Sequence, residues 1–63
     1  MNKFSVLLAD DHALMRMGLR TLVDALPDAQ VVAEAGNGHE AVALARQWRP
    51  AVAVLDIAMP QLN

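Results

Sequence analysis

The chain has 63 residues, enough for one small domain, and it contains no cysteine, an absence compatible with a reducing compartment. Its formal net charge is −2 and its basic residues are scattered, which excludes a basic patch for nucleic acid within these residues. The apolar runs are too short for a membrane span, and acidic residues appear too early for a signal-peptide core. We therefore expect a cytoplasmic protein that does not contact a membrane.

The first predicted element is a strand from Phe4 to Ala9. Its residues are mostly apolar with no regular polar alternation, which is typical of strands covered on both faces in a parallel sheet. Asp10 and Asp11 end this run. Because ligands of such sheets gather at the carboxyl ends of the strands, the two carboxylates call for a functional explanation.

An amphipathic helix is predicted next. Asp11 is the expected N-cap and Pro27 the expected terminator. Gly18 lies on the apolar face, where it suggests a close approach to a neighbouring strand. Arg16, Arg20 and Asp24 fall on the opposite face. The apolar positions recur at helical spacing: Met15, Gly18, Leu19, Leu22, Val23 and Leu26.

A second strand is predicted from Gln30 to Ala35. Glu34 makes it more polar than the first, which favours a position at the edge of the sheet. The turn Gly36-Asn37-Gly38 follows, and Asn37 is the expected N-cap of the next helix.

The second helix is predicted from His39 to Trp48, with Ala41, Leu44, Ala45 and Trp48 on one face. Pro50 ends this helix and favours an extended conformation at Arg49. The third strand is predicted from Ala51 to Asp56, an uninterrupted apolar run that a carboxylate closes.

The β-α-β-α-β order leaves two arrangements of the sheet. If the first strand lies between the other two, right-handed crossovers put the helices on opposite faces, and the strand order is 2-1-3. That order places Asp10 and Asp11 beside Asp56. The order 1-2-3 would put both helices on one face and leave the other face of the apolar third strand open to water. We therefore predict an α/β fold with the strand order 2-1-3.

Three carboxylates at one sheet edge repel one another unless a cation lies between them. Mg²⁺ prefers oxygen ligands and usually keeps waters, which leaves positions for phosphate oxygens. An Asp carboxylate can also attack a phosphoryl group and form an acyl phosphate. The cluster of Asp10, Asp11 and Asp56 therefore predicts a magnesium site suited to phosphoryl transfer.

Each of these residues also has a purely structural interpretation. Asp11 alone is typical of a helix N-cap, and Asp10 or Asp56 alone of a polar strand end. His12 and His39 have no Cys or second His at metal-ligand spacing, so we expect them to be exposed residues at a loop or helix start.

Three segments, together and in this order, resemble the receiver domain of two-component response regulators: Leu8-Ala9-Asp10-Asp11-His12, Glu34-Ala35-Gly36-Asn37-Gly38-His39-Glu40-Ala41 and Val54-Leu55-Asp56-Ile57-Ala58-Met59-Pro60. The segment from Asp11 to Arg20 is similar to the branch whose receivers precede a LuxR-type helix-turn-helix. The resemblance implies the N-terminal half of a flavodoxin-like doubly wound parallel sheet.

The resemblance also implies a role for each acidic residue. Asp56 is the expected phosphoacceptor, phosphorylated by a sensor histidine kinase to control a DNA-binding transcription regulator. Asp11 and Asp56 are expected to bind Mg²⁺ directly, with the backbone carbonyl of Ala58, and Asp10 through a metal-bound water. The domain is expected to be a phosphoacceptor rather than a stand-alone enzyme.

Residues 1–63 correspond by this resemblance to a partial receiver domain, about the first half of the family's domain. The later strands and helices, the Lys and Ser/Thr that contact the phosphoryl group, and the DNA-binding output domain are then expected elsewhere. Without a fourth strand, the third strand is an exposed apolar edge, where the chain could self-associate.

Two other functions are weighed against phosphotransfer. One is a truncated, non-catalytic fragment that acts only by self-association or partner pairing. The other is a phosphohydrolase with a strand-end Asp nucleophile, for which we expect a second Asp two residues later. Ala58 stands at that position and argues against it.

Overall fold

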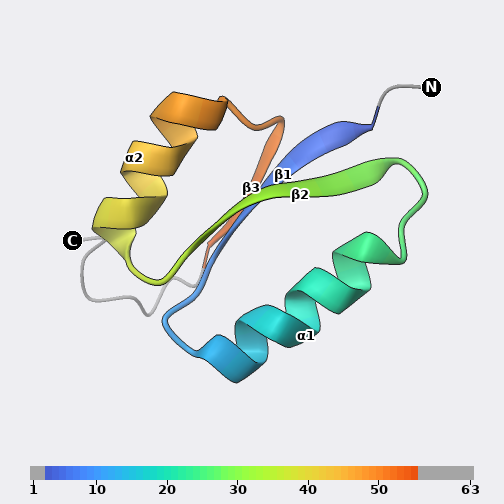
Figure 1. Ribbon diagram of the computed structural model, residues 1–63, viewed down its shortest axis with the longest axis horizontal. Coiled ribbons are helices and arrows are strands. Elements are labelled where there is room, and N and C mark those ends of the chain that lie inside the picture. Colours follow the sequence, from blue (N-terminus) through green and yellow to red (C-terminus); the bar gives the residue numbers. More distant parts are fainter. Residues whose placement is uncertain (1–2, 56–63) are drawn as a thin grey trace.

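The computed structural model describes residues 3–55, so Asp56 and Ala58 lie outside the described residues. The elements in chain order are β1 (Phe4–Ala9), α1 (Ala13–Asp24), β2 (Ala29–Ala35), α2 (Gly38–Trp48) and β3 (Val52–Leu55). The three strands are parallel and lie in the order β2-β1-β3 (Figure 1). This confirms the predicted α/β fold and the strand order 2-1-3.

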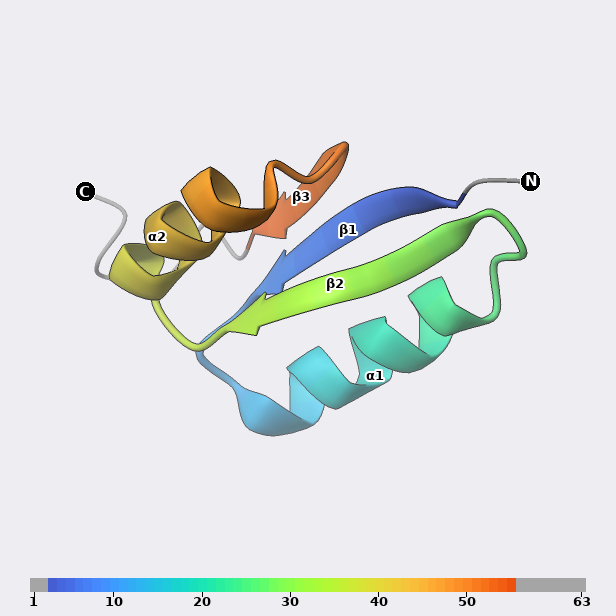
Figure 2. The same cartoon turned by 45° about the horizontal axis from the view of Figure 1, so that its top comes forward.

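The side chains of β1 alternate between two apolar clusters, one on each face of the sheet. Val6 and Leu8 pack towards α1, where Leu19 and Val23 cover them. Ala9 belongs to the other cluster, which α2 covers with Ala41 and Leu44. The two helices therefore lie on opposite faces of the sheet, as the handedness of parallel crossovers requires (Figure 2).

The sequence predicts that β1 and β3 are both covered on their two faces, but only β1 is buried in this way. Leu8 is 0% exposed, whereas Val52 and Leu55 of β3 are each 43% exposed. Both helices pack chiefly over β1 and β2, and within residues 3–55 no strand pairs with the outer side of β3. The prediction of a third strand covered on both faces is therefore wrong for the described part of β3, whereas the expected exposed apolar edge is confirmed.

The start of α1 differs from the prediction. Asp11 does not cap the helix: the N-cap is His12, whose side chain makes no capping hydrogen bond. The carboxylate that bonds to the backbone at the start of the helix is that of Asp10, whose Oδ1 accepts the N–H of His12 at 2.8 Å. A carboxylate before the N-cap thus holds the tight turn out of β1, and Asp11 is left facing outward.

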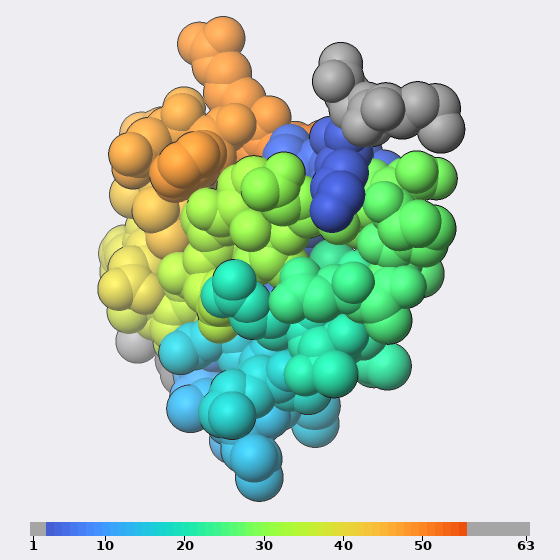
Figure 3. Space-filling model, turned by 45° about the vertical axis from the view of Figure 1, so that its right-hand side comes forward, coloured from blue at the N-terminus to red at the C-terminus, as the bar shows by residue number. Residues whose placement is uncertain are grey.

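The apolar face of α1 is only partly covered. Leu19 and Val23 pack on the sheet, but Met15, Leu22 and Leu26 are 59%, 68% and 51% exposed. A Cβ added to Gly18 would have nothing within 4 Å, so the predicted close approach of this glycine to a strand is wrong. In Figure 3 the surface of α1, coloured light blue to green, lies against the light green surface of β2.

The turn from β2 into α2 forms as predicted. The side chain of Asn37 caps α2 by accepting the N–H of Glu40 at 2.9 Å, and Glu40 Oε1 accepts the N–H of Gly36 at 2.7 Å. These reciprocal bonds satisfy backbone donors at the turn. β2 is also an edge strand, as Glu34 suggested.

The end of α2 departs from the sequence-based expectation. Arg49 has φ 47° and ψ 57°, a left-handed conformation rather than the predicted extended one. Its N–H bonds to the carbonyl of Ala45 and completes the last turn. Pro50 disfavours the right-handed helical conformation at Arg49, and the left-handed cap avoids that conformation while completing the last turn. Trp48 is 49% exposed, so it lies at the margin of the core.

Candidate functional site

The acidic pair lies where β1 ends. Asp10 is buried, with 4% of the residue exposed, and its N–H donates to the carbonyl of Ala35 at 3.1 Å. The Asp11 side chain is 38% exposed. The two neighbouring carboxylates therefore differ in role: that of Asp10 is fixed in the structure, and that of Asp11 is presented to solvent.

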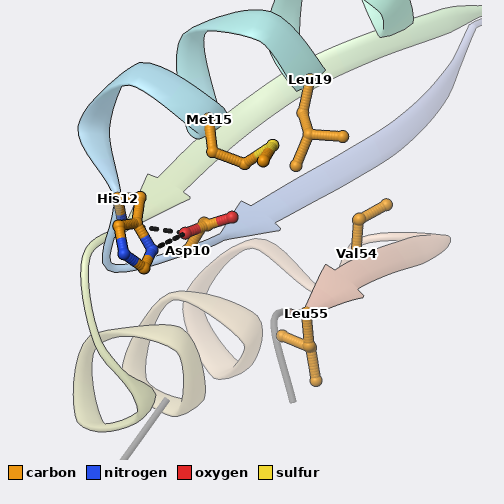
Figure 4. Close-up of a pocket in the computed structure, with 6 residues that line it drawn as sticks. All are labelled: Asp10, His12, Met15, Leu19, Val54 and Leu55. Carbon is orange, nitrogen blue, oxygen red and sulfur yellow. Dashed lines mark hydrogen bonds and ion pairs between the residues drawn. The ribbon is translucent and has the colours of Figure 1, made fainter. Parts of the chain in front are cut away.

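His12 lies beside both acids. Its Nδ1 is 2.9 Å from Asp11 Oδ1, and its side chain is 74% exposed. The same Nδ1 is 3.5 Å from Asp10 Oδ1 (Figure 4). One ligand atom from each of these three residues lies within 4.8 Å of the others. His12 is thus exposed at the helix start, as predicted, and so is His39 in the first turn of α2. The closeness of His12 to Asp10 and Asp11 was not predicted.

The register of β1 and β3 decides what else approaches the acidic pair. Ala9 pairs with Leu55, so the two strands reach the same edge of the sheet together. A hollow opens between this edge and α1, and Figure 4 shows the side chains around it. Its lining residues are Asp10, His12, Met15, Leu19, Val54 and Leu55. Asp56 and Ala58, the other expected site residues, lie outside the described residues.

The oxygen donors present suit a hard divalent cation. The two carboxylates offer several lone pairs, of which one on Asp10 is used by the His12 N–H. Mg²⁺ takes such oxygens and keeps its remaining positions for water or phosphate. The chemistry of the donor set therefore fits the predicted magnesium site.

Arg16 is the residue near this site that the sequence-based reasoning misplaced. Helical spacing put it on the outer face of α1, but only 25% of its side chain is exposed. Its guanidinium donates to the Asp10 carbonyl at 2.8 Å and to Glu34 Oε1 at 3.2 Å. The available signal in the sequence was Glu34, because a partly buried carboxylate in a mostly apolar strand is a natural partner for a cation on the covering helix.

Arg20 shares Glu34 with Arg16. Its guanidinium bonds to Glu34 Oε2 and forms an ion pair with Asp24 at 3.6 Å. The hydrogen bond to Glu34, followed by the charge of that carboxylate, raises the pKa of Arg20 above its ordinary value. Arg20 thus stays cationic, but it makes its contacts on the exposed side of α1.

Comparisons with known proteins agree with the fold and the motifs. The response regulator receiver domain family matches residues 6–63. The uncharacterised transcriptional regulatory protein YxjL of Bacillus subtilis is 45% identical over 62 residues, which are 98% of this chain and 28% of YxjL. The chain thus spans between a quarter and a third of that curated relative.

Solved structures give the same result. The receiver domain of the putative response regulator NarL from Mycobacterium tuberculosis superposes with a TM-score of 0.92 at 37% identity, covering 95% of this chain and 48% of that one. A chain in the complex of the CheA3 P1 domain with CheY6 from R. sphaeroides gives 0.82 at 39% identity, covering 95% and 47%.

Within residues 3–55, no helix is long and apolar enough to cross a membrane. The parallel sheet, the acidic pair at the end of its central strand and the family match over nearly the whole chain lead to one assignment. The chain belongs to the response regulator receiver domain family.

Proposed function

We propose that this receiver sequence accepts a phosphoryl group on Asp56 from the phosphohistidine of a sensor histidine kinase. We further propose that Asp11, Asp56 and the carbonyl of Ala58 bind Mg²⁺ directly, with Asp10 acting through a metal-bound water. The observation that carries the proposal is the pairing of Ala9 with Leu55. The residues that follow this pair in the sequence are Asp10 and Asp56.

The proposed transfer is a single displacement at phosphorus. An oxygen of the Asp56 carboxylate attacks the phosphorus, the new O–P bond forms, and the N–P bond of the phosphohistidine breaks. The released imidazole takes up a proton from water. When bound, Mg²⁺ would supply neutralisation of charge on the phosphoryl oxygens and in-line orientation.

The described residues contribute by holding their oxygens in place before the donor arrives. Asp10 is fixed by three hydrogen bonds, one each at its backbone N–H, its carbonyl and its carboxylate. Such preorganisation lowers the cost of bringing like charges together during the reaction.

The kinase partner is proposed from the family and from one structural neighbour. That neighbour is found in a complex of the P1 domain of CheA3 with CheY6. Relatives include the nitrate/nitrite response regulator NarL of Escherichia coli and a protein-glutamate methylesterase of Thermotoga maritima, so related sequences occur in longer proteins with different activities. We favour a DNA-binding transcription regulator with a LuxR-type helix-turn-helix, because the segment from Asp11 to Arg20 resembles that branch.

A second candidate function is association through the outer edge of β3. The exposed apolar side chains of Val52 and Leu55 favour it, since an unpaired apolar edge is a template for another strand. A chain that acts only in this way would associate without any need for Asp56. Sedimentation of the wild-type chain and of Asp56→Asn, with and without a phosphodonor, separates association alone from association that follows phosphorylation.

Phosphodonor labelling tests the main proposal. The chain, alone and within a longer protein that carries it, is treated with acetyl phosphate in Mg²⁺ or in chelator, and its intact mass is measured. We expect one phosphoryl group in Mg²⁺, none in chelator and none in Asp56→Asn. Asp28→Asn is the matched control, because Asp28 is an exposed carboxylate just before β2, and it should be labelled like the wild type. Labelling of Asp56→Asn at the wild-type level would contradict the proposal.

A further inference from the structure

Arg16 joins the first turn of α1 to the ends of two strands. Its Nη1 donates to the carbonyl of Asp10 at 2.8 Å and to that of Ala35 at 3.3 Å, and its Nε donates to Glu34 Oε1 at 3.2 Å. Ala35 is the last residue of β2, and Asp10 directly follows β1. One guanidinium therefore fixes the carboxyl ends of both strands relative to α1.

Asp10 is consequently held by hydrogen bonds at its N–H, its carbonyl and its carboxylate. Its N–H donates to the carbonyl of Ala35, its own carbonyl accepts from Arg16, and its carboxylate accepts from the N–H of His12. Of these three bonds, the one to Arg16 is assisted by a formal positive charge and comes from a separate element. It fixes the peptide plane that joins Asp10 to Asp11.

We propose that Arg16 is a positioning residue for the acidic site. Its contact with the Asp10 carbonyl sets the direction in which the carboxylates of Asp10 and Asp11 leave β1. This inference rests on the proposed function above, since it concerns how the same carboxylates meet Mg²⁺. Arg16 itself touches neither of the two carboxylates in the described contacts.

The shape of the guanidinium matters here as well as its charge. Arginine offers five N–H donors in a planar fork, so Nη1 and Nε can serve carbonyls and a carboxylate together. A lysine would keep the positive charge near the acids but could not reproduce this fork. Arg16→Lys therefore separates positioning from charge neutralisation, and Arg16→Gln removes both.

Arg20 supplies the matched control. It binds the same Glu34 and lies one turn further along α1, but within residues 3–55 its partners are Glu34 and Asp24 alone. Arg20→Gln removes one positive charge from the same helix without touching the carbonyl of Asp10 or Ala35.

Two measurements on the wild type and these variants test the proposal. The first is hydrogen exchange of the His12 amide by NMR, without metal, with the Leu8 amide of the buried central strand as the internal reference for global stability. The second is Mg²⁺ affinity by calorimetry. We expect Arg16→Lys and Arg16→Gln to speed His12 exchange about tenfold and to weaken Mg²⁺ binding about tenfold, which is the usual effect of losing a residue that orients a ligand. Leu8 exchange should stay unchanged, and Arg20→Gln should behave like the wild type.

The outcomes separate the positioning role from the function itself. If Arg16→Lys exchanges His12 and binds Mg²⁺ like the wild type, the positioning role is wrong. If the wild type binds no Mg²⁺ while His12 exchange still depends on Arg16, the proposed function fails and the anchoring stands. If Arg16→Lys does not fold, Arg16→Gln carries the test, with Leu8 exchange showing that the variant is folded. His12 exchange about tenfold faster than in the wild type then supports the role, and exchange as slow as in the wild type overturns it.

Discussion

The carboxylate of Asp10 accepts the backbone N–H of His12 at 2.8 Å, so a residue of the acidic site also shapes the chain between β1 and α1. This bond makes the local structure depend on an oxygen at that position rather than on a charge. It leads to a prediction that separates the structural use of Asp10 from its use as a ligand.

Asp10→Asn should be at least as stable as the wild type in chelator, because an amide oxygen can accept the His12 N–H in the same place and the repulsion with Asp11 is removed. Asp10→Ala removes the same charge and should be about 1 kcal/mol or more less stable than Asp10→Asn, since the variant leaves that donor without its partner. Urea denaturation of both variants in chelator measures the difference. Equal stability of the two variants would show that the hydrogen bond is not what Asp10 contributes.

Removing the Asp11 carboxylate should stabilise the chain in chelator. Its carboxylate lies beside that of Asp10, and in chelator no metal ion offsets the repulsion between the two. We expect Asp11→Ala to melt at a higher temperature than the wild type in chelator and to lose the Mg²⁺-dependent gain. For a ligand at tenfold above its Kd that gain is about 1.4 kcal/mol, or roughly 5 to 10 °C in a domain of this size. Melting curves at pH 8, with and without Mg²⁺, test both parts, and identical curves for the two proteins would count against a shared metal site.

The cap of α2 gives a prediction that is independent of the metal. The Asn37 side chain accepts the N–H of Glu40, so Asn37→Ala should cost about 1 kcal/mol, whereas Asn37→Asp should keep the cap. Gln47→Ala, at an exposed position near the end of the same helix, is the control and should change stability little. The midpoint of urea denaturation reports all three, and a loss in Asn37→Asp equal to that in Asn37→Ala would rule out the cap as the cause.

Gly18 is a site where a larger residue should stabilise the chain. A Cβ there would meet nothing within 4 Å, and glycine within a helix costs about 0.5 to 1 kcal/mol relative to alanine. Gly18→Ala should therefore raise the free energy of unfolding by about that amount. Ala43→Gly, at an exposed position within α2, should lower it by a similar amount. Destabilisation by Gly18→Ala would mean that this side of α1 is more crowded than the described residues indicate.

The sequence predicts the fold through a few strong local signals. The apolar run from Phe4 to Ala9 and the helical spacing around Leu19 and Val23 have single structural interpretations. The handedness of crossovers, together with the need to cover both faces of the sheet, then favours one strand order. The Asn37 cap was also predictable, because a polar turn residue directly preceded an amphipathic segment. Each of these features depends on residues close together in the chain.

The misplaced features depend on partners distant in sequence. Periodicity assigned Arg16 to solvent, because nothing local reveals that the carbonyls of Asp10 and Ala35 end beside it. Apolar composition likewise cannot tell a central strand from an edge strand, so Val52 and Leu55 were expected to be covered although they are half exposed. At Arg49 the steric effect of Pro50 favoured an extended conformation, whereas the residue is left-handed and caps α2 through a bond to the carbonyl of Ala45.

The central claim is that Asp56 carries the phosphoryl group, and chemical trapping tests it most directly. The chain is labelled with acetyl phosphate in Mg²⁺ and reduced with borohydride, which converts an aspartyl phosphate to homoserine, and the peptides are sequenced by mass spectrometry. We predict homoserine at position 56 and unmodified aspartate at Asp10 and Asp11. Homoserine at Asp10 or Asp11 with none at position 56 would contradict the account.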